Sequence, residues 1–520
     1  LRPPQDSAPF DPPPDAGPAQ IVVNQFRVVG STVFSDAELA AVLAPFVDRP
    51  LSFGELLAAS RQVTELYVSN GYVTTGAFIP AGQVIDGGVV TIQVVEGRLA
   101  EIDIDGLQRL NPDYVRSRIA TATPQPLNIQ TLLETLQILQ LNPLIESLSA
   151  ELVATPNPGE NNLLVTVTEA DSFDLQFQLS NRESPLLSTF QQRVDIREGN
   201  LTGNGDALTV TYQHAGQSNT LQLGYSLPIS PSNTTFEGTY SYVDSQVVEP
   251  PLGLINPQSE AHTWQLGVRH PILETPQDKI TLGLALEQRR SQTFLQPPGL
   301  SRIPFGFPGS GTSSDGFIKL TTLSFTQEWQ QQTPDSLLFL GSEFRLGTGL
   351  LGASGSDDAR DPGVEYLTWQ GQLLWLQRLN PNWLLIARSA LQVSDRPLVS
   401  AEQFSLGGAG SVRGYRADRV LADNGWLLSL ELQTPILDWP EQSSTVTLAT
   451  FLDYGLAWNQ DGQALNIEGR DLAAIGAGLI WDVDNRFNVR LDWALPIINV
   501  QNSGSTLQES GFTFSITGNL

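Results

Sequence analysis

Cysteine and methionine are absent from this chain of 520 residues, and histidine occurs only three times. Without cysteine there is no disulfide, no thiolate nucleophile and no zinc site with cysteine ligands. This absence suits an oxidising envelope compartment. Without methionine, Leu1 cannot be a translation start, so we expect a processed mature form or a trimmed chain. A signal peptide that had been removed would leave no trace in it.

Basic residues and long apolar runs are also scarce. Lys and Arg total 28 against 55 Asp and Glu, which gives a formal net charge of −27. Nucleic-acid binding needs clustered Lys and Arg to contact phosphates, so this balance argues against it. The sequence contains no stretch of about eighteen apolar residues, so it predicts no transmembrane helix. A membrane protein with this sequence would have to be a β-barrel.

No catalytic constellation stands out in the sequence. His214, His262 and His270 are scattered without the spacing of metal ligands, and we interpret them as ordinary histidines of a barrel wall. The G-x-S-x-G motif and the P-loop lysine are both missing. Carboxylates are plentiful, but no pair can be singled out. We therefore predict that the protein is not an enzyme and has no cofactor and no metal site.

Residues 1–20, LRPPQDSAPFDPPPDAGPAQ, are rich in proline and have no apolar periodicity. This composition predicts a disordered or polyproline linker. A stable helix is not expected there, because proline removes a backbone donor and clashes with the preceding turn.

Two repeated units follow, at residues 21–97 and 98–170. Each is predicted to contain a strand, two helices and two more strands. In the first unit, a strand is expected at Val22–Val29, and Ser35 and Ser52 each precede a glutamate by three residues, which predicts two capped helix starts. The unit ends in VVEG, and the second unit ends similarly in VTEA. The order alone is equally typical of a two-domain α+β module of unspecified role.

Residues 171–520 lose the helical periodicity, and alternating strands replace it. Strands of about ten residues with one apolar face are typical of outer-membrane barrels. We count sixteen such segments, joined by short turns that alternate with long loops. Sixteen strands would enclose a wet lumen that is too wide for side chains to fill. The long loops are expected at residues 244–260, 294–315, 350–364 and 398–424.

The stretch SLGGAGSVRGYRADRV, residues 405–420, is unusually rich in glycine. A dinucleotide-binding loop needs glycines spaced G-x-G-x-x-G at the start of a helix. Gly408 and Gly410 fit this spacing, but Arg413 occupies the third position and more loop follows. By the strand count the stretch lies between strands 11 and 12, which makes it the sixth external loop.

These features together are specific. Two N-terminal units, a sixteen-strand barrel and VRGY in the sixth external loop resemble an outer-membrane translocator with POTRA domains. Two such domains resemble the two-partner secretion transporters of the hemolysin secretion/activation family (FhaC/ShlB/HecB-like). The resemblance covers about residues 20–520, and FLDYG on predicted strand 13 supports it. It implies α+β POTRA-like domains in the periplasm and an all-β barrel in the outer membrane of a Gram-negative-type envelope.

The resemblance also implies a role for the motif Val412, Arg413, Gly414 and Tyr415. In the family this loop, here 398–424, folds back into the barrel. Glycine allows a hairpin to pass through a lumen with little bulk, and a tyrosine ring offers a flat surface that packs on the inner wall. The alternative is a surface loop with a solvated arginine.

The implied partner of Arg413 is Asp453. Strand parity places Phe451, Asp453 and Gly455 toward the lumen, and Glu431 points inward as well, which makes it a second possible partner. A guanidinium can hold a carboxylate at two points. An exposed pair would contribute only about 0–1 kcal/mol, whereas breaking a shielded one could cost on the order of 3 kcal/mol.

The function implied by the resemblance is export of a partner protein. The POTRA-like domains would bind the unfolded partner at exposed strand edges, and the partner would thread the lumen without nucleotide hydrolysis. We expect a large adhesin- or hemolysin-like cargo of β-helical fold, contact with outer-membrane lipid, and a monomeric transporter. Several family members begin with a helix that plugs the pore, which we do not expect in residues 1–20. The alternatives are an insertase that assembles barrel proteins and a passive porin.

Overall fold

The computed structural model describes residues 20–356, 361–460, 471–484, 486–500 and 506–520. The predicted proline-rich linker and the expected absence of a plug helix concern residues 1–20, which lie outside the described residues except for Gln20. The chain divides into two compact units. Within the ranges given above, no helix has the length and apolar character needed to cross a membrane.

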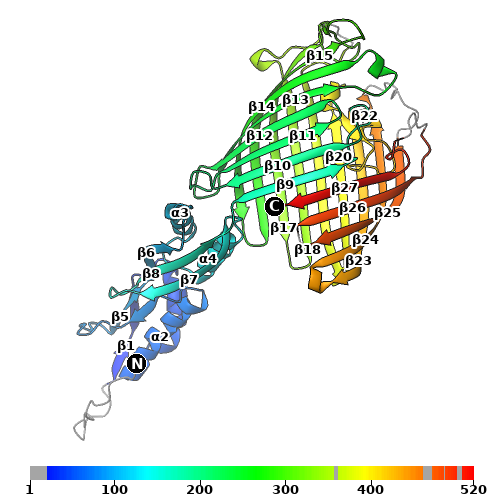
Figure 1. The fold of residues 1–520 in the computed structure, drawn as a ribbon. Coiled ribbons are helices and arrows are strands. Elements are labelled where there is room, and N and C mark those ends of the chain that lie inside the picture. Colours follow the sequence, from blue (N-terminus) through cyan, green and yellow to red (C-terminus); the bar gives the residue numbers. More distant parts are fainter. Residues whose placement is uncertain (1–19, 357–360, 461–470, 485, 501–505) are drawn as a thin grey trace. The chain divides into compact units, whose positions relative to one another are not determined.

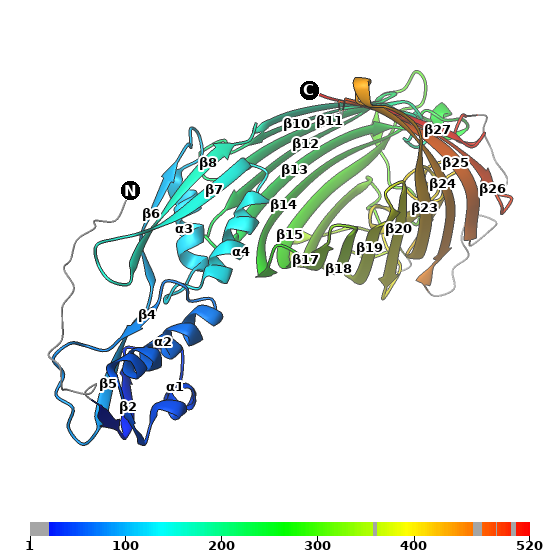
Figure 2. The ribbon, with the colours of Figure 1, turned by 90° about the horizontal axis from the view of Figure 1, so that it is seen from below.

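The N-terminal part forms two small α+β units, each built on a three-stranded sheet. They have the strand orders β2–β5–β4 and β6–β8–β7, and the first strand of each runs parallel to the central one. Helices cover one face of each sheet (Figure 2). The elements are β1 Ile21–Val23, β2 Gln25–Val29, α1 Asp36–Leu43, β3 Arg49–Leu51, α2 Phe53–Ser69, β4 Gly76–Phe78, β5 Val89–Val95, β6 Arg98–Asp105, α3 Pro112–Ala122, α4 Ile129–Gln140, β7 Ile145–Ala154 and β8 Glu160–Glu169.

Both predicted helix starts carry the expected caps. The Ser52 hydroxyl accepts a hydrogen bond from the Glu55 N–H at 3.3 Å, and the Glu55 carboxylate accepts one from the Ser52 N–H at 2.8 Å. Ser35 makes the same reciprocal pair at the start of α1. Each cap satisfies backbone donors that the first turn of a helix leaves free.

The single strand predicted at Val22–Val29 is wrong. Asn24 interrupts it, because its N–H donates to the Gly88 carbonyl at 2.8 Å and its side-chain amide donates to the Gly87 carbonyl at 3.0 Å. The residues before Asn24 pair with β3, and those after it pair with β5. Strand β3 was not predicted.

Glu96 fastens the segment that connects β2 to α1. Its carboxylate accepts hydrogen bonds from the N–H and hydroxyl of Thr32, both at 2.6 Å, and from the N–H of Val33 at 3.3 Å. Tyr67 Oη lies 2.8 Å from the same carboxylate. Burial raises the pKa of Tyr67 to about 12, so this hydroxyl keeps its proton. The contacts tie the end of the sheet to the start of the helical layer.

Glu169 holds the equivalent position in the second repeat. It accepts hydrogen bonds from the backbone N–H groups of Gln108, Arg109 and Leu110, at 2.7, 2.9 and 2.8 Å. The similar endings VVEG and VTEA therefore mark the same connection in both repeats.

The described residues from Phe173 onward form a closed sheet of sixteen antiparallel strands (Figure 1). The two-residue strand β16, Ile303–Pro304, pairs only with the end of β15, which continues its main pairing with β17. The sixteen strands are β9 Phe173–Ser180, β10 Gln191–Gly199, β11 Ala207–Ala215, β12 Ser218–Pro228, β13 Thr235–Gln246, β14 Pro257–Glu274, β15 Asp278–Leu295, β17 Phe317–Gln332, β18 Ser336–Thr348, β19 Tyr366–Asn380, β20 Trp383–Ser394, β23 Asn424–Trp439, β24 Ser444–Trp458, β25 Asp471–Val483, β26 Phe487–Pro496 and β27 Phe512–Asn519. The predicted fold class is confirmed.

Along each strand, residues alternate as predicted between an exposed apolar outer face and an inner face. On β14, Trp264, Leu266 and Val268 are 40%, 57% and 41% exposed. On β24, Phe451 and Asp453 are buried while Leu452 between them is exposed. This period of two is what a barrel with an apolar outer surface requires.

The long loop predicted at residues 244–260 is shorter than expected. Strand pairing extends into the predicted loop at both ends, because Asp244 pairs with Glu260 and Gln246 pairs with Gln258. Polar side chains at these positions resemble loop composition in the sequence, but here they extend a ladder beyond the apolar band.

The Glu96 contacts predict a pH-dependent stability of the first repeat. Burial alone would raise the pKa of Glu96, but hydrogen bonds from Thr32, Tyr67 and Val33 outweigh it and hold the pKa below its ordinary value. Such a carboxyl stabilises the fold above its unfolded pKa of about 4.3, and the contribution is lost as the pH falls through the lower folded value. Glu96→Gln should therefore destabilise this region at neutral pH, by about 1.5 kcal/mol.

Hydrogen–deuterium exchange of the full chain in detergent would measure this. Amides of residues 31–34 should exchange about tenfold faster in Glu96→Gln at neutral pH, and the difference from wild type should shrink as the pH is lowered. Glu65→Gln, on the exposed face of α2, is the control. Equal protection in all three proteins at neutral pH would contradict the role assigned to Glu96.

Candidate functional site: the loop inside the barrel

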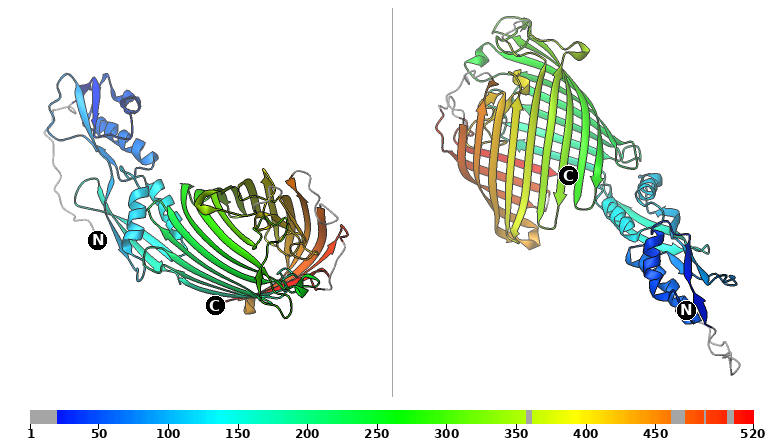
Figure 3. Two further views of the ribbon diagram at one scale, coloured as in Figure 1. Left: turned by 90° about the horizontal axis from the view of Figure 1, so that it is seen from above. Right: turned by 180° about the vertical axis from the view of Figure 1, so that it is seen from behind.

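The segment between β20 and β23 returns into the ring of strands (Figure 3, left). It contains the short strands β21 Phe404–Leu406 and β22 Val420–Ala422, which pair with each other. Leu406, Val412 and Tyr415 are buried, and they pack in one cluster with wall residues that include Leu472. The sixth external loop is thus a hairpin held against the inner wall.

Two glycines allow the hairpin to lie this close. Gly414 has φ +88°, in the left-handed region that favours glycine. A Cβ atom on Gly455 of β24 would lie 2.8 Å from Leu406 Cδ2 and 2.9 Å from Val412 Cγ2. Gly455, which was predicted to face the lumen, therefore provides the space that Val412 and Leu406 occupy.

Arg413 makes a two-point contact with Asp453. Its Nε and Nη2 donate to the two carboxylate oxygens at 2.7 and 2.8 Å, and its backbone N–H donates to the same carboxylate at 3.1 Å. The side chains of Arg413 and Asp453 are 6% and 0% exposed. Charge-assisted bidentate bonds of this kind combine strength with fixed orientation.

Glu431 of β23 is a second partner of the same guanidinium. Arg413 Nη1 donates to Glu431 Oε2 at 2.6 Å. Ser429, also on β23, accepts from Arg413 Nη2 at 3.2 Å and donates to Asp453 at 2.7 Å. The Arg413 guanidinium carbon lies 3.4 Å from the centre of the Phe451 ring. One loop arginine thus contacts side chains of two neighbouring wall strands.

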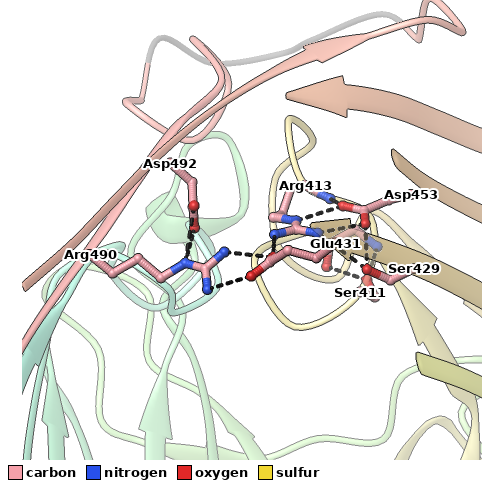
Figure 4. Close-up of polar contacts among 8 residues, drawn as sticks. Ser411, Arg413, Ser429, Glu431, Asp453, Arg490 and Asp492 are labelled. Carbon is pink, nitrogen blue, oxygen red and sulfur yellow. Dashed lines mark hydrogen bonds and ion pairs between the residues drawn. The ribbon is translucent and has the colours of Figure 1, made fainter. Parts of the chain in front are cut away.

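The network continues to a third strand, β26 (Figure 4). Arg490 donates to both carboxylate oxygens of Glu431, at 3.2 and 2.8 Å, and its Nε donates to Asp492 at 2.8 Å. Glu431 therefore lies between two guanidinium groups. Its negative charge would be costly in such a buried place without them.

Tyr415 fixes the other side of the motif. Its hydroxyl lies 2.9 Å from the Ala473 carbonyl oxygen and 2.7 Å from that of Ile498. The hydroxyl also accepts a hydrogen bond from the Ala473 N–H at 3.3 Å. The ring therefore packs on the wall, and its polar end is satisfied by backbone groups.

Two further ion pairs, which were not predicted, hold the loop outside the VRGY motif. Arg416 donates to both oxygens of Glu249, in the loop between β13 and β14, at 3.0 and 2.5 Å. Glu402, at the start of the loop, contacts Arg345 of β18 at 3.1 Å. Neither pair has a sequence signal, because the partners lie far apart in the chain and in different loops or strands.

The structure brings together all the predicted site residues. Arg413 contacts Asp453, Glu431 and Phe451, and Val412 packs on Gly455. Sequence reasoning missed Arg490 and Asp492. Strand parity was the signal that could have found them, because both alternate with the apolar residues of NVRLDWAL on the last hairpin.

The three histidines lie on barrel strands and make separate contacts. Each forms one hydrogen bond through Nδ1: His214 with Asn219, His262 with Tyr240 and His270 with Thr234. Among the described residues, no group of three metal-ligating side chains occurs.

Family models match most of this architecture. The model for the haemolysin secretion/activation protein ShlB/FhaC/HecB matches residues 159–301 and 316–480, and the model for the ShlB-type POTRA domain matches residues 21–97. The heme/hemopexin transporter protein HuxB of Haemophilus influenzae (strain 86-028NP) is 23% identical over 480 residues, which cover 89% of this chain and 81% of HuxB. The outer membrane transporter CdiB of Escherichia coli O6:K15:H31 (strain 536 / UPEC) is 25% identical over 447 residues, which cover 83% of this chain and 72% of CdiB.

Solved structures show the same fold. CdiB from Escherichia coli superposes with a TM-score of 0.72 at 22% identity, covering 99% of this chain and 93% of CdiB. BamA from Haemophilus ducreyi lacking POTRA domains 1–3 superposes with a TM-score of 0.56 at 16% identity, covering 96% of this chain and all of the BamA chain.

The secretion-protein model spans more than half of the chain, a POTRA match precedes it, and the sixteen strands close into a barrel. The chain therefore belongs to the haemolysin secretion/activation protein ShlB/FhaC/HecB family, and it is an outer-membrane transporter of partner proteins with its POTRA domains in the periplasm.

Proposed function

We propose that this transporter exports a large adhesin- or haemolysin-like protein of β-helical fold, and that this cargo passes through the barrel lumen as an unfolded, extended chain. The transporter acts as a monomer in contact with outer-membrane lipid. Folding of the cargo outside the cell biases the direction of transport, because the sequence contains no nucleotide-binding motif. The insertase alternative shares the barrel fold, but the matching family model is that of a secretion protein.

The proposal assigns one task to each region. Residues 21–97 and 98–170 are POTRA-like domains that bind the cargo, and residues 171–520 are the pore. The POTRA match at residues 21–97 supports the first of these domains. The order of elements around β6–β8–β7 supports the second.

Strand β7 is the best candidate for the cargo-binding edge. It stands at the edge of its sheet, is ten residues long and is mostly exposed. The other edges are shorter: β6 in the same sheet has eight residues, and β2 and β4 in the other sheet have five and three. An extended peptide that adds to a free edge gains main-chain hydrogen bonds whatever its sequence, and side-chain contacts add selectivity.

The anchored loop shapes the path through the lumen. The observation that carries this assignment is the buried contact of Arg413 with both Asp453 and Glu431. Both carboxylates belong to the wall, so the contact keeps the hairpin on one side of the ring. A hairpin released from the wall would be free to obstruct the lumen.

Cargo binding at β7 can be tested with a single introduced cysteine, because the chain has none of its own. Glu151 is an exposed residue of β7. Glu151→Cys carrying a photo-crosslinker should form an adduct with the cargo during export. Glu134→Cys, on the exposed face of α4, is the control and should not. Equal yields at both positions would exclude β7 as the preferred edge.

The loop anchor predicts a defect in export without a defect in folding. Arg413→Ala should leave the barrel inserted, with heat-modifiable migration on gels, because the hydrogen bonds of the wall strands are unchanged. Release of the cargo into the medium should fall strongly, since leaving buried carboxylates without their partner costs on the order of 3 kcal/mol. Arg413→Lys should restore export only in part, because lysine lacks the planar two-point contact.

The matched control and a coupling test sharpen this prediction. Arg388→Ala removes an exposed arginine of β20 that lies opposite Ser429 and so faces the lumen without contacting Asp453 or Glu431, and it should export normally. A charge swap, Arg413→Asp with Asp453→Arg, is made together with Glu431→Gln, because Glu431 would otherwise repel the new aspartate. Recovery of export over either single variant in that background would demonstrate coupling. Normal export by Arg413→Ala would refute the proposal that export needs the contact of Arg413 with Asp453 and Glu431.

A further inference from the structure

The ring of strands closes through one short ladder, between β27 and β9 (Figure 1). Five pairs of residues form it, from Ser515 opposite Ser180 to Asn519 opposite Gln176. Both neighbouring ladders are longer, with seven pairs between β26 and β27 and eight between β9 and β10. We call the contact between β27 and β9 the closing joint. Because backbone hydrogen bonds hold the strands together, the closing joint is held less firmly by its ladder than either neighbour.

Asn181 extends the closing joint beyond its last backbone pair. Its N–H donates to the Phe514 carbonyl at 3.3 Å, as the next pair of the ladder would. The Phe514 N–H, however, donates to the side-chain Oδ1 of Asn181 at 2.6 Å, and Asn181 Nδ2 donates to the Phe512 carbonyl at 3.0 Å. A side chain therefore takes the place of the backbone carbonyl at this end of the joint.

Gln508 binds the Asn181 carbonyl, which the ladder does not use. Its Nε2 donates to that carbonyl at 2.6 Å and to the Glu183 carbonyl at 2.7 Å. Gln508 is only 1% exposed. It lies in the turn directly before β27, where the Gly511 N–H donates to the Gln508 carbonyl at 2.9 Å. The glutamine side chain thus links the start of β27 to the segment that follows β9.

A third hydrogen bond of Gln508 reaches the loop inside the barrel. Its Oε1 accepts from the Ala417 N–H at 2.9 Å, two residues beyond the VRGY motif. Arg416 lies beside the same turn, with Nη1 3.5 Å from Glu509 Oε1. The loop is therefore held at two separate places, by Arg413 on β23 and β24 and by Ala417 at the closing joint.

The Gln508 amide joins three segments because its groups are shared between them. Its donors go to the segment after β9, and its oxygen goes to the loop. If the loop moved away, the buried oxygen would lose its donor, and a buried polar group without a partner is costly. The side chain would then turn toward water, which would withdraw its donors from Asn181 and Glu183. Departure of the loop therefore weakens the closing joint.

We propose that Gln508 is a positioning residue that couples the seated loop to the closure of the barrel. While Arg413 holds the loop on the wall, Ala417 keeps Gln508 in place, and Gln508 keeps Asn181 on β27. The coupling is reciprocal, as linkage between two sites requires, so an intact closing joint also favours the seated loop. This inference concerns the barrel itself and does not depend on the cargo.

Hydrogen–deuterium exchange of the full chain in detergent tests the coupling without cargo, so its outcome is separate from that of the export proposal. Gln508→Met keeps the side chain long and unbranched but removes its hydrogen bonds. The amides of Asn181 and Phe514 should exchange about fivefold faster in this variant, the factor that corresponds to one neutral hydrogen bond. Arg413→Ala should also speed exchange at Phe514, although it changes no residue of the closing joint.

A double-variant cycle distinguishes coupling from general loosening. Adding Arg413→Ala to Gln508→Met should change exchange at Phe514 by less than about twofold, because the link from loop to joint is already broken. Gln258→Met is the control. It removes a glutamine hydrogen bond to Gln296, at 2.8 Å, from β14, and Phe514 should exchange as in wild type. Heat-modifiable migration on gels checks that each variant is folded.

Unchanged exchange at Phe514 in Arg413→Ala would overturn the proposal, and this result stays decisive even if Gln508→Met does not fold. Unchanged exchange at Asn181 in folded Gln508→Met would overturn it as well. A full additional effect of Arg413→Ala in the Gln508→Met background would show that the loop and the joint open independently. Faster exchange at Phe514 in Gln258→Met would show general loosening, which also contradicts the role assigned to Gln508.

Discussion

Backbone groups that face hydrocarbon must find their hydrogen-bond partners inside the protein, and the architecture of this chain depends on that constraint. The sheet meets it by closing: β27 pairs with β9, so that Ser515 lies opposite Ser180 and no edge remains within the ring. Sixteen strands close at a diameter that side chains cannot fill. The lumen therefore has room for a hairpin, and an unfilled pore of this width would leak small solutes.

Buried charge then determines where that hairpin lies. A guanidinium that leaves water is strongly disfavoured unless carboxylates and other acceptors meet it. The wall supplies these acceptors from two paired positions of β23 and β24: Asp453 lies opposite Ser429, and Phe451 lies opposite Glu431. Arg413 contacts all four of these side chains. Arg490 also holds Glu431 in place, so Glu431 cannot follow the loop. A shift of the loop by one residue would therefore leave Arg413 and Asp453 without their ion-pair partners.

The alternation of apolar and polar residues made the strand number and the inward faces of Asp453 and Glu431 predictable, because a period of two is a local property. The pairing of Arg413 with Asp453 came only from resemblance to a family, since nothing local relates residues on two different elements. The break at Asn24 was missed for the same reason: its partners, Gly87 and Gly88, lie more than sixty residues away. Strand parity could have placed Arg490 on the inner face, but its contact with Glu431 depends on how side chains of β23 and β26 reach each other along the wall.

One strand shows how the barrel separates its two surfaces. On β15, Glu287 faces inward and lies 3.5 Å from Arg345, which contacts Glu402 at the start of the loop. Three residues later, Arg290 faces outward beside Trp264. Odd and even positions of a strand point to opposite faces, so a change at Arg290 leaves the polar contacts of the lumen in place. The outer surface of the barrel and the contacts that hold the loop therefore share a backbone but no side chains.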